Sequence, residues 1–185
     1  MPESLYGQTL LRRAIGTTVE RFHRPVQALH EVRDATVAFG HTDIDRGRGI
    51  VSMLVAWLFG FPPAGRRLPT AITVLADRGA EIWHRRFAGH PILTHLEPHA
   101  AAGRSVIVER FRLGVTFDLE VTQWQGRLGF RLRGMHVCRV PVPRFLWPRL
   151  RAEERAEHGG FRFDVDIGLP GFGRLIHYRG WVRPA

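Results

Sequence analysis

From Pro69 onward, apolar residues recur at every second position, and this alternation limits the fold more than any other feature. The clearest example is the predicted strand Val115–Trp124, where apolar side chains alternate with Thr116, Asp118 and Glu120. Successive side chains of a strand point to opposite faces, so the pattern predicts one buried and one solvated face. Further strands are predicted at Thr70–Ala76, Glu81–Phe87, Ser105–Leu113, Arg127–Met135, Phe161–Ile167 and Arg174–Val182.

The dipeptide Gln125-Gly126 predicts a two-residue hairpin loop in which Trp124 faces Arg127. This register pairs Thr122 with Gly129, Glu120 with Arg131, Asp118 with Arg133, Val121 with Phe130 and Leu119 with Leu132. Opposite charges then meet on one face and apolar side chains on the other, and a shift by one residue would destroy both matches. The charged pairs are therefore expected to be structural and to lie outside any site.

Many short sequential strands joined by tight turns predict a β-dominated α+β fold, with a curved antiparallel sheet or a partly closed barrel. We expect a single domain over residues 1–185, with a helical N-terminal part at 1–35 and a β-rich body at 36–185. Periodicity alone does not distinguish a barrel that encloses a cavity from one filled with side chains.

The N-terminal third is expected to be partly helical. Ser4 is a candidate cap for a helix over Leu5–Ile15, and Thr17–Glu20 has the T-x-x-E spacing of a capping box. Pro25 suits the first turn of another short helix, which is expected over Val26–Val32.

The segment Ile50–Phe59 is almost wholly apolar and is followed by Gly60 and two prolines. A bilayer-spanning helix needs about 20 residues, so this run is too short to cross a membrane. We expect a buried or lid-like helix at 50–59, and no transmembrane segment in the chain. The alternative is an interfacial segment that makes peripheral contact with a membrane.

The formal net charge is +10, and arginine supplies all 27 basic residues. The arginines are spread along the chain with no run longer than two, so the charge does not define a binding site for nucleic acid. We therefore do not expect nucleic acid as the partner. The single cysteine, Cys138, favours a reducing compartment and is expected to be a buried, inert thiol. The N-terminus lacks the apolar region of a secretory signal, and we expect a cytoplasmic protein.

Three segments resemble the domain-of-unknown-function 4166 family: Phe161–Trp181 above all, then Pro25–His30 and Gly60–Gly65. The resemblance implies a bacterial domain that occurs alone or fused to other domains. In some relatives these are saccharopine-dehydrogenase-like or epimerase-like oxidoreductases, which makes an oxidoreductase a candidate partner. The family supplies no catalytic residues and no cofactor.

A strand near Phe39–Asp45 would place His41, Asp43 and Asp45 on one face, where they form a weak candidate metal site. The alternative is a purely structural one, a polar strand leading into a glycine turn. A second group, His90, His95 and His99, lies beside Pro91 and Pro98, which make a regular helix doubtful, and is expected at the surface or in loops.

The last predicted strand places His177, Arg179 and Trp181 on one face and Tyr178 on the other. Histidine, arginine and tryptophan together suit an anionic or amphipathic ligand, although Arg179 is more simply explained by a structural pair with Asp164 or Asp166. The candidate ligand-binding residues are His30, Trp57, His177, Tyr178, Arg179 and Trp181.

We expect this domain to bind an apolar or amphipathic small molecule inside the curved sheet, without catalysis and without a cofactor. One alternative is an enzyme or accessory domain that uses His30, Tyr178 and Arg179 beside an oxidoreductase. Another is an interaction module, whose Ile50–Phe61 segment or arginine-rich face docks a protein, a membrane or nucleic acid.

Overall fold

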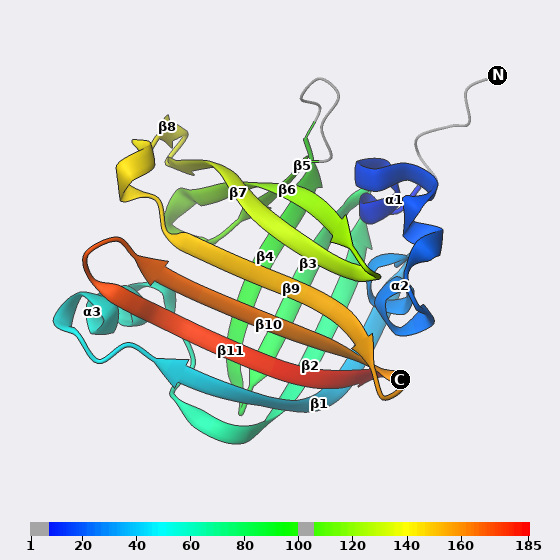
Figure 1. Ribbon diagram of the computed structural model, residues 1–185, viewed down its shortest axis with the longest axis horizontal. Coiled ribbons are helices and arrows are strands. Elements are labelled where there is room, and N and C mark those ends of the chain that lie inside the picture. The colour runs from blue at the N-terminus through cyan, green and yellow to red at the C-terminus, as the bar shows by residue number, and fades with distance from the viewer. Residues whose placement is uncertain (1–7, 100–105) are drawn as a thin grey trace.

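The computed structural model describes residues 8–99 and 106–185 of the chain, in which strands dominate (Figure 1). The helical elements are α1 (Leu10–Ile15), the 3₁₀ helix η2 (Gly16–Arg21), α2 (Arg24–His30), α3 (Ile50–Phe59) and the 3₁₀ turns η3 (Arg112–Gly114) and η4 (Arg144–Leu146). The strands are β1 (Ala35–Arg46), β2 (Gly65–Asp77), β3 (Ala80–Phe87), β4 (His90–Pro98), β5 (Val106–Arg110), β6 (Val115–Trp124), β7 (Arg127–Val137), β8 (Val140–Pro141), β9 (Arg149–Glu157), β10 (Gly160–Leu169) and β11 (Gly173–Pro184).

Ten of these strands form a closed antiparallel barrel. Each strand from β1 to β7 pairs with the next, β9 joins β7 to β10, and β11 pairs with β1 to close the ring. The short β8 pairs with β7 alone and stays outside the ring. The predicted β-dominated fold is confirmed. Of the two predicted arrangements, a curved antiparallel sheet and a partly closed barrel, the structure has the barrel, and its ring is closed.

The two ends of the barrel differ in what covers them. Since neighbouring strands are antiparallel, consecutive connections lie at alternate ends. The N-terminal helices α1 and α2 lie at one end, which we call the plug end (Figure 1). The other end, which we call the mouth end, carries α3, η3, the β7–β9 connection with β8 and η4, and the β10–β11 turn.

The plug end has a solid core. Leu11, Val26 and Leu29 of the N-terminal helices are buried against inward-facing barrel residues such as Trp83 and Phe161. Burying each side chain of this size contributes about 1.5–3 kcal/mol, which explains why short helices with little intrinsic stability hold this position. The helices reach only part of the way into the barrel.

The N-terminal helices are close to those predicted. Within the described residues, α1 begins at Leu10; Ser4 and the start of the expected Leu5–Ile15 helix lie outside them. The expected capping box at Thr17–Glu20 is wrong, because this segment is the 3₁₀ helix η2 and has no side-chain cap hydrogen bond. Pro25 lies in the first turn of α2 as predicted.

The predicted helix at 50–59 is confirmed with the same bounds as α3. Gly60 ends it in the left-handed conformation (φ 64°), which costs glycine little. Only Ser52 and Ala56 are buried, so α3 is lid-like rather than a buried core helix. No helix in the described part of the chain is long and apolar enough to span a membrane.

The predicted hairpin register is confirmed from Trp124↔Arg127 to Leu119↔Leu132. Beyond that point a bulge shifts the pairing, and Asp118 lies opposite Gly134 instead of Arg133. The bulge brings the Asp118 carboxylate over Gly134, where an added Cβ would lie 2.1 Å from an oxygen. Arg133 Nε donates instead to Glu120 Oε2 at 2.8 Å, so the charges still pair structurally.

Two long strands, β4 and β9, were not predicted from the sequence. Pro91 and Pro98 suggest a loop, but they lie near the ends of β4, whose pairing with β5 begins only at His95. The inward residues of β9 include Ala152 and Glu154, which are small or charged because they face a cavity rather than a packed core. The expected buried thiol is also wrong: Cys138 is exposed, because it lies in the tight turn between β7 and β8.

The β6–β7 turn gives a test of the fold. Gln125 and Gly126 both have positive φ, at 47° and 74°. We expect Gly126→Ala to lower the free energy of unfolding by about 1 kcal/mol, because a Cβ is unfavourable in this conformation. Gln125→Asn should raise it by up to about 1 kcal/mol, because asparagine tolerates the conformation better. Urea denaturation measures both, and changes of the same sign would contradict the turn.

Candidate functional site

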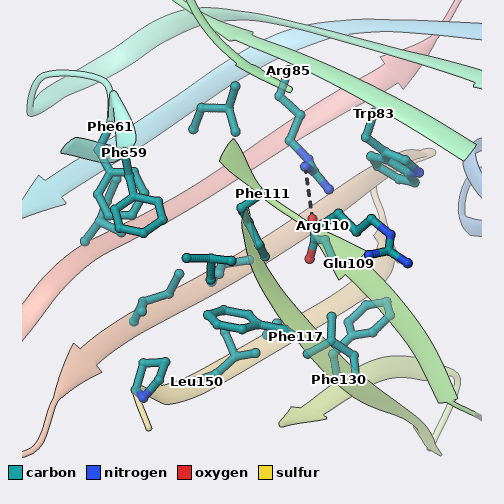
Figure 2. A pocket seen from close by; sticks show the side chains of 18 of the residues that line it. Phe59, Phe61, Trp83, Arg85, Glu109, Arg110, Phe111, Phe117, Phe130 and Leu150 are labelled. Carbon is teal, nitrogen blue, oxygen red and sulfur yellow. Dashed lines mark ion pairs between the residues drawn. The ribbon is translucent and has the colours of Figure 1, made fainter. Parts of the chain in front are cut away.

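The mouth half of the barrel is hollow. It encloses a cavity of about 680 Å³, within the range typical of small-molecule sites. Most of the wall is apolar and includes Phe59, Phe61, Phe111, Phe117, Phe130 and Leu150 (Figure 2). The barrel therefore combines the two arrangements that periodicity could not distinguish, a packed core at the plug end and a cavity at the mouth end.

The cavity reaches the surface between β4 and η3. Its lining includes the exposed residues Pro91, Leu93 and Arg112. Among the described residues, the first half of β4 has no partner on the β5 side, which leaves this gap in the wall. Phe59, the last residue of α3, and Phe61, just after it, also line the cavity.

Charged side chains lie deep in this apolar interior. We call His30, Glu81, Arg85, Glu109 and Glu154 the interior polar cluster. All but Glu81 line the cavity, and Glu81 is buried beside them. They come from α2 and from three different strands, β3, β5 and β9, so barrel closure is what brings them together.

His30 is the last residue of α2 and enters the barrel interior from the plug end. Its Nε2 lies 2.6 Å from Glu154 Oε2, and its ring lies 5.2 Å from that of Trp83. Burial opposes protonation, but the charge and hydrogen bond of Glu154, with the charge of Glu81, outweigh it and raise the pKa of His30. The short contact with Glu154 thus favours the protonated form of His30.

Arg85 is the second basic side chain of the cluster and is partly buried. Its guanidinium lies 4.7 Å from the centre of the Trp83 ring and donates to Thr94 Oγ1 at 2.8 Å. Arg85 Nη1 is 3.5 Å from Glu109 Oε1, and Figure 2 shows this pair between the aromatic residues of α3 and Trp83. A stacked, paired arginine is held in one orientation.

Glu81 has no basic partner in the described residues. Burial raises the pKa of its carboxyl group, opposed by the charge of His30 and by the hydrogen bond that its Oε2 accepts from Trp83 Nε1 at 2.8 Å. The cluster thus contains two ion pairs, His30 with Glu154 and Arg85 with Glu109, and one further buried acid.

Tyr178 adds an uncharged polar group to the wall. Its ring packs against Phe87 and Phe163, and the residue lines the cavity. Burial raises the pKa of Tyr178 to about 12, so the hydroxyl keeps its proton. In residues 8–99 and 106–185 it has no side-chain hydrogen bond, which leaves it free to bind a ligand.

Of the six candidate ligand-binding residues, His30 and Tyr178 line the cavity. The other four lie outside it. Trp57 is exposed on α3, and Trp181 Nε1 donates to the Glu157 carbonyl at 2.8 Å. His177 Nε2 bonds Asp164 at 2.9 Å, and Arg179 lies 3.9 Å from Asp43.

The mixed face of the last strand is therefore the outer face of the barrel, where structural pairs satisfy its charges. The postulated enzyme site of His30, Tyr178 and Arg179 is not assembled, because Arg179 is on the other side of the wall. The alternation in β3 contained a better signal: it places Glu81, Trp83 and Arg85 on one face with Phe87. Charged side chains on an apolar face indicate a buried polar site.

Both aspartates of the weak candidate metal site, Asp43 and Asp45, make other contacts. Asp43 accepts a hydrogen bond from the Arg67 amide at 2.8 Å, which, with nearby arginines, lowers the pKa of Asp43 despite partial burial. Asp45 is bound by Arg66, also at 2.8 Å. In the part of the chain that the structure describes, no three metal-ligating side chains gather. The expected surface position of His90, His95 and His99 is confirmed: all three are exposed, the first two on β4.

Comparison with family models now identifies the domain. The model described as "Domain of unknown function (DUF4166)" matches residues 22–182. The chain belongs to this family. The match runs from the residues just before α2 into β11, so the barrel, the cavity and the interior polar cluster all lie within the DUF4166 domain. A search of curated proteins found no match.

The His30–Glu154 pair predicts a pH dependence of stability. Because the pKa of His30 is raised in the folded protein, protonation of His30 stabilises the fold. This stabilisation is complete below the pKa of an unfolded histidine, about 6.5, and is lost as pH rises through the pKa of the folded protein. The free energy of unfolding should therefore fall toward alkaline pH. His30→Gln should lower it by about 3 kcal/mol at pH 6 and flatten this decline.

Chemical denaturation across neutral and alkaline pH measures the effect. His23→Gln is the matched control, because His23 is an exposed histidine just before α2. A decline of equal steepness in the His30 and His23 variants would contradict the assigned ion pair.

Proposed function

We propose that this DUF4166 domain binds a small amphipathic molecule in the barrel cavity and performs no chemistry on it. The observation that supports this is the cavity itself, a space of about 680 Å³ with a mostly apolar wall and an opening to the surface. At about 30 Å³ per molecule it would hold about 20 waters, most of them against apolar atoms. Replacing such water with an apolar ligand is favourable.

The polar end of the ligand is proposed to be uncharged. Both basic side chains of the interior polar cluster already have an acidic partner, since His30 pairs with Glu154 and Arg85 with Glu109. An added carboxylate would be desolvated without a free cation to bind, and an added ammonium would be desolvated beside two existing basic groups. Burying an unpaired charge is costly, whereas an alcohol, ketone, ester or amide needs only a hydrogen bond.

Tyr178 is the proposed partner for that polar group. Its neutral hydroxyl faces the cavity and has no side-chain partner in the described residues. The hydroxyl can both donate and accept, so it suits a carbonyl or a hydroxyl on the ligand.

A second candidate function is accessory work beside an oxidoreductase. It is favoured by one observation, the 2.6 Å contact between His30 and Glu154 at the cavity wall, which resembles a histidine oriented for proton transfer. In that case His30→Gln would abolish turnover by the partner enzyme while ligand binding persisted. A binding domain would leave the partner's intrinsic turnover unchanged.

Occupancy of the cavity is tested by blocking it. The neutral fluorophore Nile red should bind the wild-type protein, and Ala152→Trp should weaken binding by about tenfold or more, because Ala152 lines the cavity. Arg151→Trp adds the same side chain to the exposed outer face of β9 and should leave binding unchanged. Circular dichroism checks that both variants are folded, and equal effects of the two would contradict a site inside the barrel.

Ligand charge is tested with two competitors of equal chain length. Hexadecanol should displace Nile red at concentrations about tenfold below those of hexadecanoate, because the carboxylate finds the basic side chains of the interior already paired. Tyr178→Phe should weaken hexadecanol binding by about fivefold, which corresponds to one hydrogen bond. Native mass spectrometry of the purified protein supplies an independent measure of any co-purified molecule. Preference for hexadecanoate would contradict the proposed neutral ligand.

A further inference from the structure

The helix α3 exposes an apolar face. Four outward side chains have the i, i+3, i+4 and i+7 spacing of one helical face and are 52–80% exposed: Ile50, Met53, Leu54 and Trp57. The side toward the barrel carries Ser52, whose hydroxyl donates to the Arg174 carbonyl at 2.8 Å, the small Ala56, and Val55 and Phe59, which line the cavity. Surface helices normally turn polar side chains to solvent, so the apolar outer face of α3 is left without a partner.

Neighbouring connections add to this apolar surface. The exposed large side chains of the β7–β9 connection and the β10–β11 turn are Val140, Phe145, Leu146 and Phe172, at 53–74% exposure. Figure 1 shows α3, β8 and the β10–β11 turn at one end of the barrel. We call these residues and the outer face of α3 the mouth surface. Apolar side chains gathered in this way mark an interaction site rather than ordinary exposure.

Arginine is the charged residue of the same surface. The connections at the mouth end (47–64, 88–89, 111–114, 138–148 and 170–172) contain Arg48, Arg112, Arg139 and Arg144 but neither Asp nor Glu. Within the described part of the chain, none of these four arginines makes an ion pair. Acids near this end are neutralised by other arginines, as Asp166 is by Arg174.

We propose that the mouth surface docks on the surface of an anionic lipid bilayer. Exposed aliphatic and aromatic side chains enter the boundary between headgroups and acyl chains, and tryptophan favours that depth. Unpaired arginines around them are attracted to anionic headgroups. The charge complementarity decides the occupant: this surface offers cations and apolar groups together, and a bilayer containing acidic lipids presents both of their counterparts.

A second copy of the chain fits this surface less well. A two-fold dimer places the same patch against itself, and Arg48, Arg139 and Arg144 would then face one another without acids between them. A bilayer avoids this conflict. It also accounts for the position of the surface, because Phe59 and Phe61 at the end of α3 line the cavity that opens nearby.

Vesicle flotation tests the proposal. The protein should float with vesicles of phosphatidylcholine and phosphatidylglycerol in a two-to-one ratio, and much less with phosphatidylcholine alone. High salt should weaken the binding. Leu54→Ser with Trp57→Ser should abolish it, because both side chains are more than half exposed and belong to the docking face. Arg48→Glu with Arg144→Glu should lower the partition coefficient by at least about tenfold.

Matched controls lie elsewhere on the barrel. Phe39→Ser removes an apolar side chain that is 57% exposed on β1, and Arg24→Glu with Arg33→Glu reverses two exposed arginines toward the plug end. Both should float like the wild type. Since Cys138 is the single cysteine and is exposed at the mouth end, a nitrobenzoxadiazole label there should shift to shorter wavelength on the anionic vesicles. The same label on Arg33→Cys in a Cys138→Ser background should not shift.

Several results would overturn the proposal. One is a folded wild-type protein that stays free of both kinds of vesicle, and another is flotation that survives the Leu54 and Trp57 substitutions. A third is a dimer in light scattering that those substitutions convert to a monomer while vesicles bind neither form.

The outcome is separable from that of the proposed ligand. Flotation with an empty cavity would uphold membrane docking and oppose small-molecule binding. Nile red binding in the cavity without flotation would uphold small-molecule binding and oppose membrane docking.

Discussion

The pairing of β11 with β1 fixes the geometry on which the cavity depends. Nine consecutive register pairs, from Ala38↔Pro184 to Arg46↔Ile176, join the first and last strands of the barrel. At Gly180 the strands and side chains approach so closely that an added Cβ would lie 2.3 Å from the Phe163 ring and 2.5 Å from Thr42 Oγ1. Closure sets the circumference of the ring, and a ring of ten strands is wide enough that its own side chains need not fill it.

The N-terminal helices divide the enclosed space. They fill the plug end with aliphatic side chains, and His30 at the end of α2 marks the inner limit of that filling. Beyond it, the ion pairs of the interior polar cluster lie in an apolar enclosure. Low local polarisability strengthens the pairs within it and penalises any unpaired charge added to it. The packing of the plug end, the ion pairs of the interior polar cluster and the proposed ligand preference thus all depend on where the N-terminal helices end inside the barrel.

The sequence determines the local features well because their causes are local. The β6–β7 register follows from one turn and the side chains beside it, and the bounds of α3 follow from an apolar run ended by Gly60. The bulge at Arg133 was not predictable, since it depends on how Asp118 fits against Gly134.

The site was harder to predict because it joins distant strands. Arg85 and Glu109 belong to strands that are not neighbours, and the alternation of β9 gives no sign that Glu154 meets His30. For β11 the alternation was recognised correctly, but the residue types favoured the wrong face. Histidine, arginine and tryptophan resemble a binding surface, whereas here they lie on the outer wall. Only closure decides which face is interior.

The long sequence separation of the closing contacts has a kinetic consequence. His30 and Glu154 are 124 residues apart, and β1 finds its second partner only when β11 has formed. Such non-local contacts form late and slowly, so a chain that has most of its hairpins still has an open sheet with its apolar face in water. The cavity comes into existence with the last strand pairing. A molecule that occupies it binds the finished barrel and none of its precursors, and thereby draws the final step toward completion.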